Sequence, residues 1–382
     1  MEAILENVKK SEALKVIRGA RPYFSDTDIN DILSDVKGVL ETGNLMLGPY
    51  TAKLEEKFAS YVGTKYAVAT SSCTSALEIA MRFFELRSSE VIVPTNTFIA
   101  CPNSVIFAGG RPVFSDIDPQ TYCTTLENVI KKQSNKTRGV MAVHLGGLPL
   151  NDIRAMHELC EKKEMFLIED CSHAHGAMID GAKVGSIGDV GCFSLMATKV
   201  ITSGLGGMLV TNNKDIYEYA LETRNSASGR VSPIRRIASD WMMSEVTAAI
   251  GVRQFDNLEK ILEVRRAIAQ RYKEGLSNLK NVTFYEPPSN VRQTYYKFLA
   301  TLGKGADKAK VISEAKSVGI EIGSLYETPC HMHPLYQNMG YKIGECPVAE
   351  ESLKHQIALP VHVKITDEDT ELINQFMKER IG

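Results

Sequence analysis

Short apolar runs alternate with amphipathic stretches over residues 50–211. The runs are rich in Val, Ile and Phe and are apolar without interruption, which predicts strands buried on both faces of a mainly parallel sheet. The predicted strands are Tyr66–Ser71, Val91–Pro94, Pro112–Asp116, Gly139–Leu145, Met165–Glu169, Gly191–Leu195 and Gly207–Thr211. Helices are expected between them at Leu54–Val62, Ser75–Leu86, Leu126–Gln133 and Asp152–Lys163. This alternation predicts a layered α/β domain with right-handed crossovers.

The pattern changes after residue 211. A long amphipathic helix opens at Asp256, and the strands that follow it are fewer and farther apart. The later expected elements are strands at Val282–Tyr285, Tyr296–Leu302 and Ile320–Leu325, and helices at Ala306–Val318 and Asp367–Arg380. We therefore expect a large α/β domain over residues 1–255, N-terminal segment included, and a small C-terminal α+β domain over residues 256–382.

Composition narrows the functional classes. The chain has 382 residues, is 44% hydrophobic and carries a formal net charge of −2, which is typical of a globular protein without a nucleic-acid or membrane surface. No run of about 18 apolar residues predicts a membrane span. The N-terminus lacks the layout of a secretory signal, and the eight cysteines form no C-x-x-C pair. We expect a reduced, cytoplasmic location and no metal site.

The first candidate site is Ser71-Ser-Cys-Thr-Ser75, where a predicted strand gives way to a helix. Ligands in such sheets bind beyond the carboxyl ends of the strands. Hydroxyl side chains and free N–H groups at a helix start can hold a phosphate. Ser75 and Glu78 also have the spacing of a capping box, and a plain helix cap is the commoner use of such residues.

The second candidate is the segment Glu169-Asp170-Cys-Ser-His173-Ala-His175. Asp170 follows an apolar strand directly, so its carboxylate should project at the ligand-binding edge and could keep a heteroaromatic nitrogen protonated. A helix cap is the common alternative for such an Asp. His173 and His175 could share a face and bind zinc, but ordinary hydrogen bonding suits at least one of them better.

The third candidate is Lys199, in the apolar and hydroxyl-rich stretch Ser194-Leu-Met-Ala-Thr-Lys199. A desolvated amine would be available as a nucleophile, although an isolated lysine is more often a surface residue. The glycines that follow, Gly204, Gly206 and Gly207, do not form a dinucleotide-binding fingerprint and are interpreted as turns.

The order of these features indicates one cofactor. Pyridoxal phosphate has an anionic phosphate, a flat ring that needs a stacking partner, a ring nitrogen that a carboxylate keeps protonated, and an aldehyde that reacts with lysine. A hydroxyl-rich helix start, an aromatic residue after a strand, an Asp at a strand end and then a Ser and a Lys supply all of these partners.

The chain resembles the DegT/StrS family of sugar aminotransferases, which have fold type I of aspartate aminotransferase. The resemblance runs from about Leu47 to Phe376. Among the matching pieces are Leu47-Gly-Pro-Tyr50, Ser72-Cys-Thr-Ser-Ala-Leu77, Val91-Ile-Val-Pro-x-x-Thr-Phe98, Glu169-Asp-x-x-His-Ala-x-Gly176, Phe193-Ser-x-x-x-Thr-Lys199, Met243-Ser-Glu245 and Tyr326-x-x-Pro-x-His331.

The resemblance implies roles for single residues. Lys199 would bond covalently to the cofactor and later move protons, and Asp170 would bind the pyridine nitrogen. The remaining cofactor contacts would be Phe98 on the ring, His173 beside it, and Thr74, Ser75 and Ser194 at the phosphate. Tyr326 and His331 could face the substrate. The resemblance further implies transfer of an amino group, with glutamate as donor, to a nucleotide-linked keto-sugar, in a homodimer with shared active sites.

Several positions depart from the family pattern. Cys73 replaces a glycine, Val200 replaces an Asn, and Leu205 replaces an acidic residue. Asp240 and Met242 replace the Asn and Arg of a segment that reaches the neighbouring subunit's site. These changes leave open a family member that binds cofactor or sugar without catalysis. The related sugar dehydratases carry His at the lysine position, so Lys199 argues against that activity, and a nicotinamide dehydrogenase would need a fingerprint loop.

Overall fold

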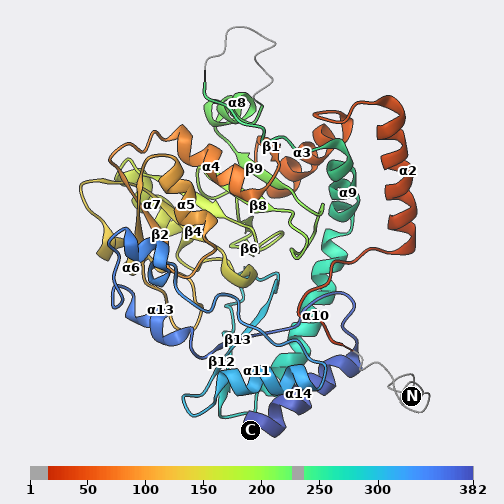
Figure 1. Cartoon of the computed structure of the whole chain (residues 1–382), viewed down its shortest axis with the longest axis vertical. Helices are drawn as coiled ribbons and strands as arrows, with labels where there is room; N and C mark the ends of the chain where they lie inside the picture. Colours follow the sequence, from red (N-terminus) through yellow and green to blue (C-terminus); the bar gives the residue numbers. More distant parts are fainter. Residues whose placement is uncertain (1–15, 226–235, 382) are drawn as a thin grey trace, which may run out of the picture.

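The computed structural model describes residues 16–225 and 236–381, and a seven-stranded sheet lies at its centre (Figure 1). The strand order is β1-β9-β8-β5-β4-β2-β3. The bounds are β1 Tyr66–Thr70, β2 Glu90–Pro94, β3 Arg111–Ser115, β4 Thr137–Val143, β5 Phe166–Asp170, β8 Val190–Ser194 and β9 Gly207–Thr211. All seven predicted strands are confirmed to within two residues at either end.

The direction of the strands brings the candidate residues to one edge. The β2–β3, β2–β4, β4–β5 and β5–β8 pairs are parallel, whereas β9 is antiparallel to both β1 and β8. The carboxyl ends of six strands and the start of β9 therefore meet at the same edge. This mixed but mainly parallel α/β sheet confirms the predicted fold class.

Helices cover both faces of the sheet. Alternate residues divide between the faces: Val68 and Leu209 pack in the core beside α4, and Ala69 and Met208 pack in the core beside α3 and α9. The bounds are α2 Asp26–Thr42, α3 Pro49–Val62, α4 Cys73–Phe83, α5 Ala100–Phe107, α6 Leu126–Lys132, α7 Ile153–Lys162, α8 Lys214–Thr223, α9 Glu245–Asp256 and α10 Leu258–Leu276. Helices α2, α5, α8 and α9 were not predicted from the sequence.

The C-terminal part builds a second, three-stranded sheet, β10-β12-β13. Its strands are β10 Val282–Thr283, β12 Phe298–Leu302 and β13 Gln356–Leu359, and its helices are α11 Lys308–Ser317 and α14 Asp367–Ile381. The remaining elements are α12 Pro334–Asn338, α13 Pro347–Ser352 and a small sheet of β11 Val291–Arg292, β6 Met178–Ile179 and β7 Ala182–Lys183. The strand predicted at Ile320–Leu325 is wrong, because this run makes only isolated bridges to Ile17 and Ala358.

The hydrophobic cores only partly follow the expected division of the chain. A separate core joins α10, α11, α14 and the β10-β12-β13 sheet, and it includes Ile17 from the N-terminal segment. Cys330, Tyr336 and Leu353, however, pack in the core of the large sheet. The domain boundary at residue 255 stays a prediction.

The expected cytoplasmic location rested on the cysteines and on the lack of a predicted membrane span. All eight cysteines are buried free thiols. Within the described residues, no helix has the length and apolar character that a membrane span requires. The cytoplasmic location stays a prediction.

Candidate functional site

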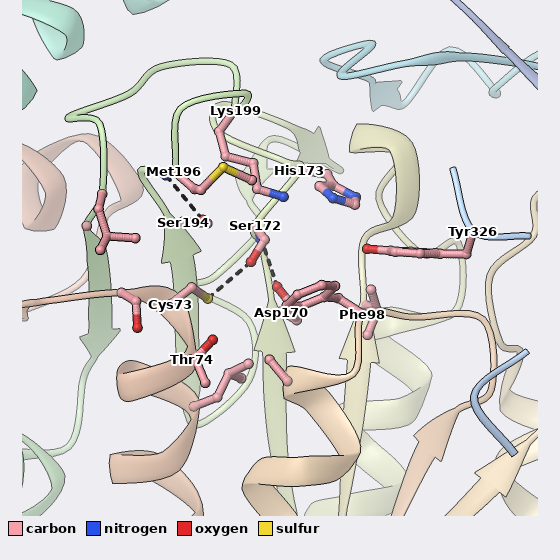
Figure 2. Close-up of a pocket in the computed structure, with 16 residues that line it drawn as sticks. Cys73, Thr74, Phe98, Asp170, Ser172, His173, Ser194, Met196, Lys199 and Tyr326 are labelled. Atoms are coloured by element: carbon pink, nitrogen blue, oxygen red, sulfur yellow. Dashed lines mark hydrogen bonds between the residues drawn. The ribbon is translucent and has the colours of Figure 1, made fainter. Parts of the chain in front are cut away.

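A cavity of about 250 Å³ opens at the edge where the strands of the large sheet end (Figure 2). Seven of the nine predicted site residues line it: Thr74, Phe98, Asp170, His173, Ser194, Lys199 and Tyr326. They come from segments as far apart in the sequence as residues 74 and 326. Ser75 and His331 lie outside the cavity lining.

The start of α4 forms one wall of the cavity. Helix α4 begins at Cys73, and the Ser72 side chain caps it by accepting a hydrogen bond from the backbone N–H of Ser75. The predicted Ser75–Glu78 capping box is therefore wrong, because the helix starts two residues earlier and Glu78 pairs with Arg82. The Ser75 hydroxyl is buried against the hydroxyls of Ser71 and Ser72, so it supports the helix start from behind.

Strand β9 packs directly against this helix start. An added Cβ on Gly207 would lie 2.3 Å from the carbonyl carbon of Ser72 and 2.4 Å from the backbone nitrogen of Cys73. Gly207 is therefore required by a close approach of two backbones, and the interpretation of this glycine as a turn is wrong. Gly204, with a φ of +86°, does occupy a turn.

Asp170 ends β5 with its carboxylate at the cavity. Its side chain is 6% exposed, and each oxygen accepts one hydrogen bond. Oδ1 accepts from the backbone N–H of Ser172 at 2.9 Å, and Oδ2 accepts from the Cys101 thiol at 3.0 Å. The alternative role as a helix cap does not apply, because Asp170 is held in a turn that faces the cavity.

His173 lies beside the cavity in a stack of aromatic rings. Its ring centroid is 4.2 Å from that of Tyr296, and its Nδ1 accepts the backbone N–H of Gly146 at 3.4 Å. Burial, with the nearby Lys199 charge, lowers the pKa of His173 well below its usual value. The imidazole is therefore neutral, and since Nδ1 accepts a hydrogen bond, the ring proton resides on Nε2.

His175 does not share this environment. It is 1% exposed and packs edge-on or tilted against Phe58 and Phe193. Burial, followed by the Lys199 charge, lowers the pKa of His175 to about 3. His175 is a core residue, which removes the paired-histidine zinc interpretation.

A buried group of three possible metal ligands includes both sequence neighbours of Asp170. Donor atoms of His144, Glu169 and Cys171 lie within 4.8 Å of one another. The Glu169 oxygens, however, already accept the backbone N–H groups of residues 185, 187 and 188, as well as a 2.9 Å contact with His144 Nε2. Burial opposes ionisation of Glu169, but the His144 contact and the backbone donors together hold its pKa below the usual value. This cluster fixes the loop that follows β7.

Lys199 lies on the loop that joins the antiparallel strands β8 and β9. This loop crosses the edge of the sheet, so the Lys199 amine reaches the cavity from the side opposite Phe98 (Figure 2). Lys199 Nζ is 5.0 Å from the centroid of the Tyr296 ring. Ser194, at the end of β8, is nearly buried, and its hydroxyl accepts the backbone N–H of Met196.

Phe98 and Tyr326 complete the cavity, and His331 does not. Phe98 is 54% exposed, which is high for a phenylalanine ring on a cavity wall. The hydroxyl of Tyr326 points into the cavity (Figure 2). His331 is fully buried between the Thr95 hydroxyl, 2.6 Å from Nδ1, and Glu350, 2.9 Å from Nε2. The predicted substrate contact of His331 is thus not accessible, and this residue ties the segment after Pro329 to the end of β2.

Three residues at or beside the cavity were not predicted from the sequence: Cys101, Ser172 and Tyr296. Cys101 touches Asp170, Tyr296 stacks on His173, and the Ser172 hydroxyl donates to Cys73 Sγ at 3.1 Å. Cys101 is the second residue of a helix that the periodicity did not reveal, and Tyr296 comes from the C-terminal part of the chain. Ser172 alone could have been inferred, from its place two residues after Asp170.

Residues 26–378 match the DegT/DnrJ/EryC1/StrS aminotransferase family. The chain belongs to this family. GDP-perosamine synthase of Escherichia coli O157:H7 is 31% identical over 344 residues, which are 87% of this chain and 92% of that protein. The UDP-N-acetyl-3-dehydro-alpha-D-glucosamine 3-aminotransferase of Acidithiobacillus ferrooxidans is also 31% identical, over 89% of this chain and 90% of the relative. These matches confirm the predicted family and the predicted class of enzyme, a sugar aminotransferase.

The fold is also that of solved relatives. The PLP form of Spr1654 from Streptococcus pneumoniae has a TM-score of 0.88 at 24% identity, over 95% of this chain and 98% of that one. That structure supports the fold and shows pyridoxal phosphate in a protein of this architecture.

Proposed function

We propose that this protein is a pyridoxal-phosphate-dependent aminotransferase that moves an amino group from glutamate to a nucleotide-linked keto-sugar. The observation that carries the proposal is the cavity that joins Lys199, Asp170, Phe98 and the start of α4. The two relatives above are named for a GDP-linked and a UDP-linked product or substrate, so the family supports a nucleotide sugar but does not select the base.

The side chains around the cavity fit the cofactor in their chemistry. Thr74, Ser194 and the first N–H groups of α4 would hold the phosphate, since a helix start favours anions. Asp170 would hold the protonated ring nitrogen. The pyridine ring of the cofactor would stack on the exposed ring of Phe98. Lys199 would hold the cofactor by a covalent bond from Nζ.

The protein supplies positions and protons for the transfer. Bound pyridoxal phosphate supplies an aldehyde that can exchange amino groups and a ring that can take up the electrons left when the donor loses its α-proton. Lys199 Nζ would take that proton and return it, because it reaches the cavity opposite Phe98. Neutral His173 would donate its Nε2 proton to an acceptor on the cofactor. Tyr326 would present its hydroxyl to the sugar.

The mouth of the cavity favours a homodimer. Leu205, 59% exposed, lies on the rim, and the neighbouring Gly206 approaches Met243. Met46, itself 40% exposed, forms a backbone bridge with Ser244, the residue that follows Met243. Exposed apolar groups around a binding site are typical of an interface, and a second copy would cover them. Met46→Glu should convert a dimer of twice 42.2 kDa into a monomer in sedimentation equilibrium, and a wild-type monomer would contradict the shared-site proposal.

The proposed reaction is tested in two half-reactions. Protein loaded with pyridoxal phosphate should show a visible absorption band that glutamate removes and that a keto-sugar nucleotide restores. Aspartate and alanine serve as donor controls, and GDP-, UDP- and dTDP-linked keto-sugars test the acceptor. A band that forms but that no amino acid alters would favour a protein that binds the cofactor without catalysis.

A further inference from the structure

We propose that Cys101 is a positioning residue for the Asp170 carboxylate, and this inference rests on the proposed function. Cys101 is the second residue of α5 and is fully buried, and its thiol donates to Asp170 Oδ2 at 3.0 Å. The thiol in turn accepts a hydrogen bond from the Thr97 hydroxyl at 3.0 Å. Thr97, Cys101 and Asp170 thus form a buried relay in which each member orients the next.

The order of donors and acceptors in this relay orients the S–H of Cys101. The Thr97 hydroxyl donates to sulfur, so the S–H of Cys101 is free to point at Asp170. A thiol is a weak donor, but an ionised acceptor strengthens the bond. Burial, then the negative charge of Asp170, raises the pKa of Cys101 well above its usual value, so the proton remains on sulfur.

The other carboxylate oxygen is fixed independently. Oδ1 of Asp170 accepts the backbone N–H of Ser172 at 2.9 Å. With one donor on each oxygen, from α5 on one side and from the turn after β5 on the other, the plane of the carboxylate cannot rotate freely. A group that is already oriented loses less freedom when a ligand binds. Cys101 should therefore strengthen cofactor binding without touching the cofactor.

The other cysteines near Asp170 do not share this role. The Cys73 thiol lines the cavity, yet its sulfur accepts the Ser172 hydroxyl and has no hydrogen bond to Asp170 among the contacts of the described chain. Cys160 is as deeply buried as Cys101 but lies on α7, outside the cavity lining, and offers a matched control.

The test compares Cys101→Ala with Cys101→Ser. Both side chains are smaller than cysteine, but only serine restores a donor. Titration of pyridoxal phosphate into the cofactor-free protein should give a dissociation constant about tenfold higher for Cys101→Ala and within about threefold of wild type for Cys101→Ser. Cys160→Ala and Cys160→Ser should both bind like wild type, and thermal unfolding of the cofactor-free variants measures the packing cost separately.

A purely structural role predicts a different order. If Cys101 only fills space, the Cys101→Ser protein should bind the cofactor no more tightly than the Cys101→Ala protein, because serine leaves a similar gap and adds a buried hydroxyl. Equal or weaker binding by Cys101→Ser would overturn the inference. Should Cys101→Ala fail to fold, Thr97→Val removes the first donor of the relay at nearly constant volume and should weaken binding by about threefold; unchanged binding would refute the relay. A wild-type protein that does not bind pyridoxal phosphate would instead refute the proposed function.

Discussion

Replacement of Gly207 by alanine tests where the phosphate binds. The added Cβ would lie 2.3 Å from the Ser72 carbonyl carbon, whereas ordinary contact begins at 3.4 Å. Because the contacted atoms belong to backbone, β9 and the start of α4 must separate by about 1 Å. A shift of this size takes a hydrogen bond of about 2.9 Å beyond its working range.

The expected loss follows from the bonds that break. A hydrogen bond to a charged group is worth about 1.5–3 kcal/mol, so the loss of one N–H contact from α4 should raise the dissociation constant for pyridoxal phosphate about 10- to 150-fold. The crowding itself should lower the free energy of unfolding by about 1–3 kcal/mol. Both quantities are measurable, by absorbance titration and by urea unfolding of the cofactor-free protein.

Two controls separate the phosphate effect from general damage. Gly305 is exposed and has no neighbour within 4 Å of an added Cβ, so Gly305→Ala should leave binding unchanged. Gly204→Ala places strain at a φ of +86° in the loop that precedes β9, without a clash, and should affect stability more than binding. If Gly207→Ala binds pyridoxal phosphate as tightly as wild type, the phosphate is not held at the start of α4.

Two further changes probe the ring site and the core beside it. Asp170→Asn should keep cofactor affinity within about tenfold but lower the rate of the glutamate half-reaction by about 100-fold or more in stopped-flow absorbance, and an unchanged rate would exclude a ring-nitrogen role. His175→Leu should make the free energy of unfolding less sensitive to acid. The wild-type histidine has a pKa of about 3 when folded and 6.5 when unfolded, so at pH 5 it gains its proton only on unfolding. Between pH 7.5 and pH 5, the free energy of unfolding should therefore fall by about 2 kcal/mol more in wild type than in the variant. Equal losses in urea titrations at the two pH values would refute a buried neutral His175.

The sequence predicted the sheet well because its strands are buried on both faces. Continuous apolar runs such as Phe166–Ile168 leave few alternatives, and the polar residues that end them, Asp170 among them, mark the ligand-binding edge. Helix α2 was not predicted, although Ile29, Leu33, Val36 and Leu40 recur at helical spacing and form an apolar face, of which Leu33 and Leu40 remain exposed. Its capping box, Ser25 with Asp28, was a usable signal.

Contacts between distant segments could not be predicted. His331 follows the family motif, but its burial depends on Thr95 and Glu350, which no local pattern links to it. The sequence placed the cap of α4 at Ser75, whereas the helix is capped by Ser72, and the backbone of Ser72 packs closely against Gly207 of β9. In both cases the partner in contact lies in another part of the chain.

The proposed function is tested most directly by whether Lys199 bonds covalently to pyridoxal phosphate. Protein loaded with pyridoxal phosphate is reduced with borohydride, digested and examined by mass spectrometry, with Lys199→Ala and the exposed Lys364→Ala as paired variants. In wild type and in Lys364→Ala, the peptide containing residue 199 should carry the cofactor mass, whereas Lys199→Ala should be unlabelled and inactive. A loaded, active protein whose Lys199 remains unmodified would contradict the proposed function.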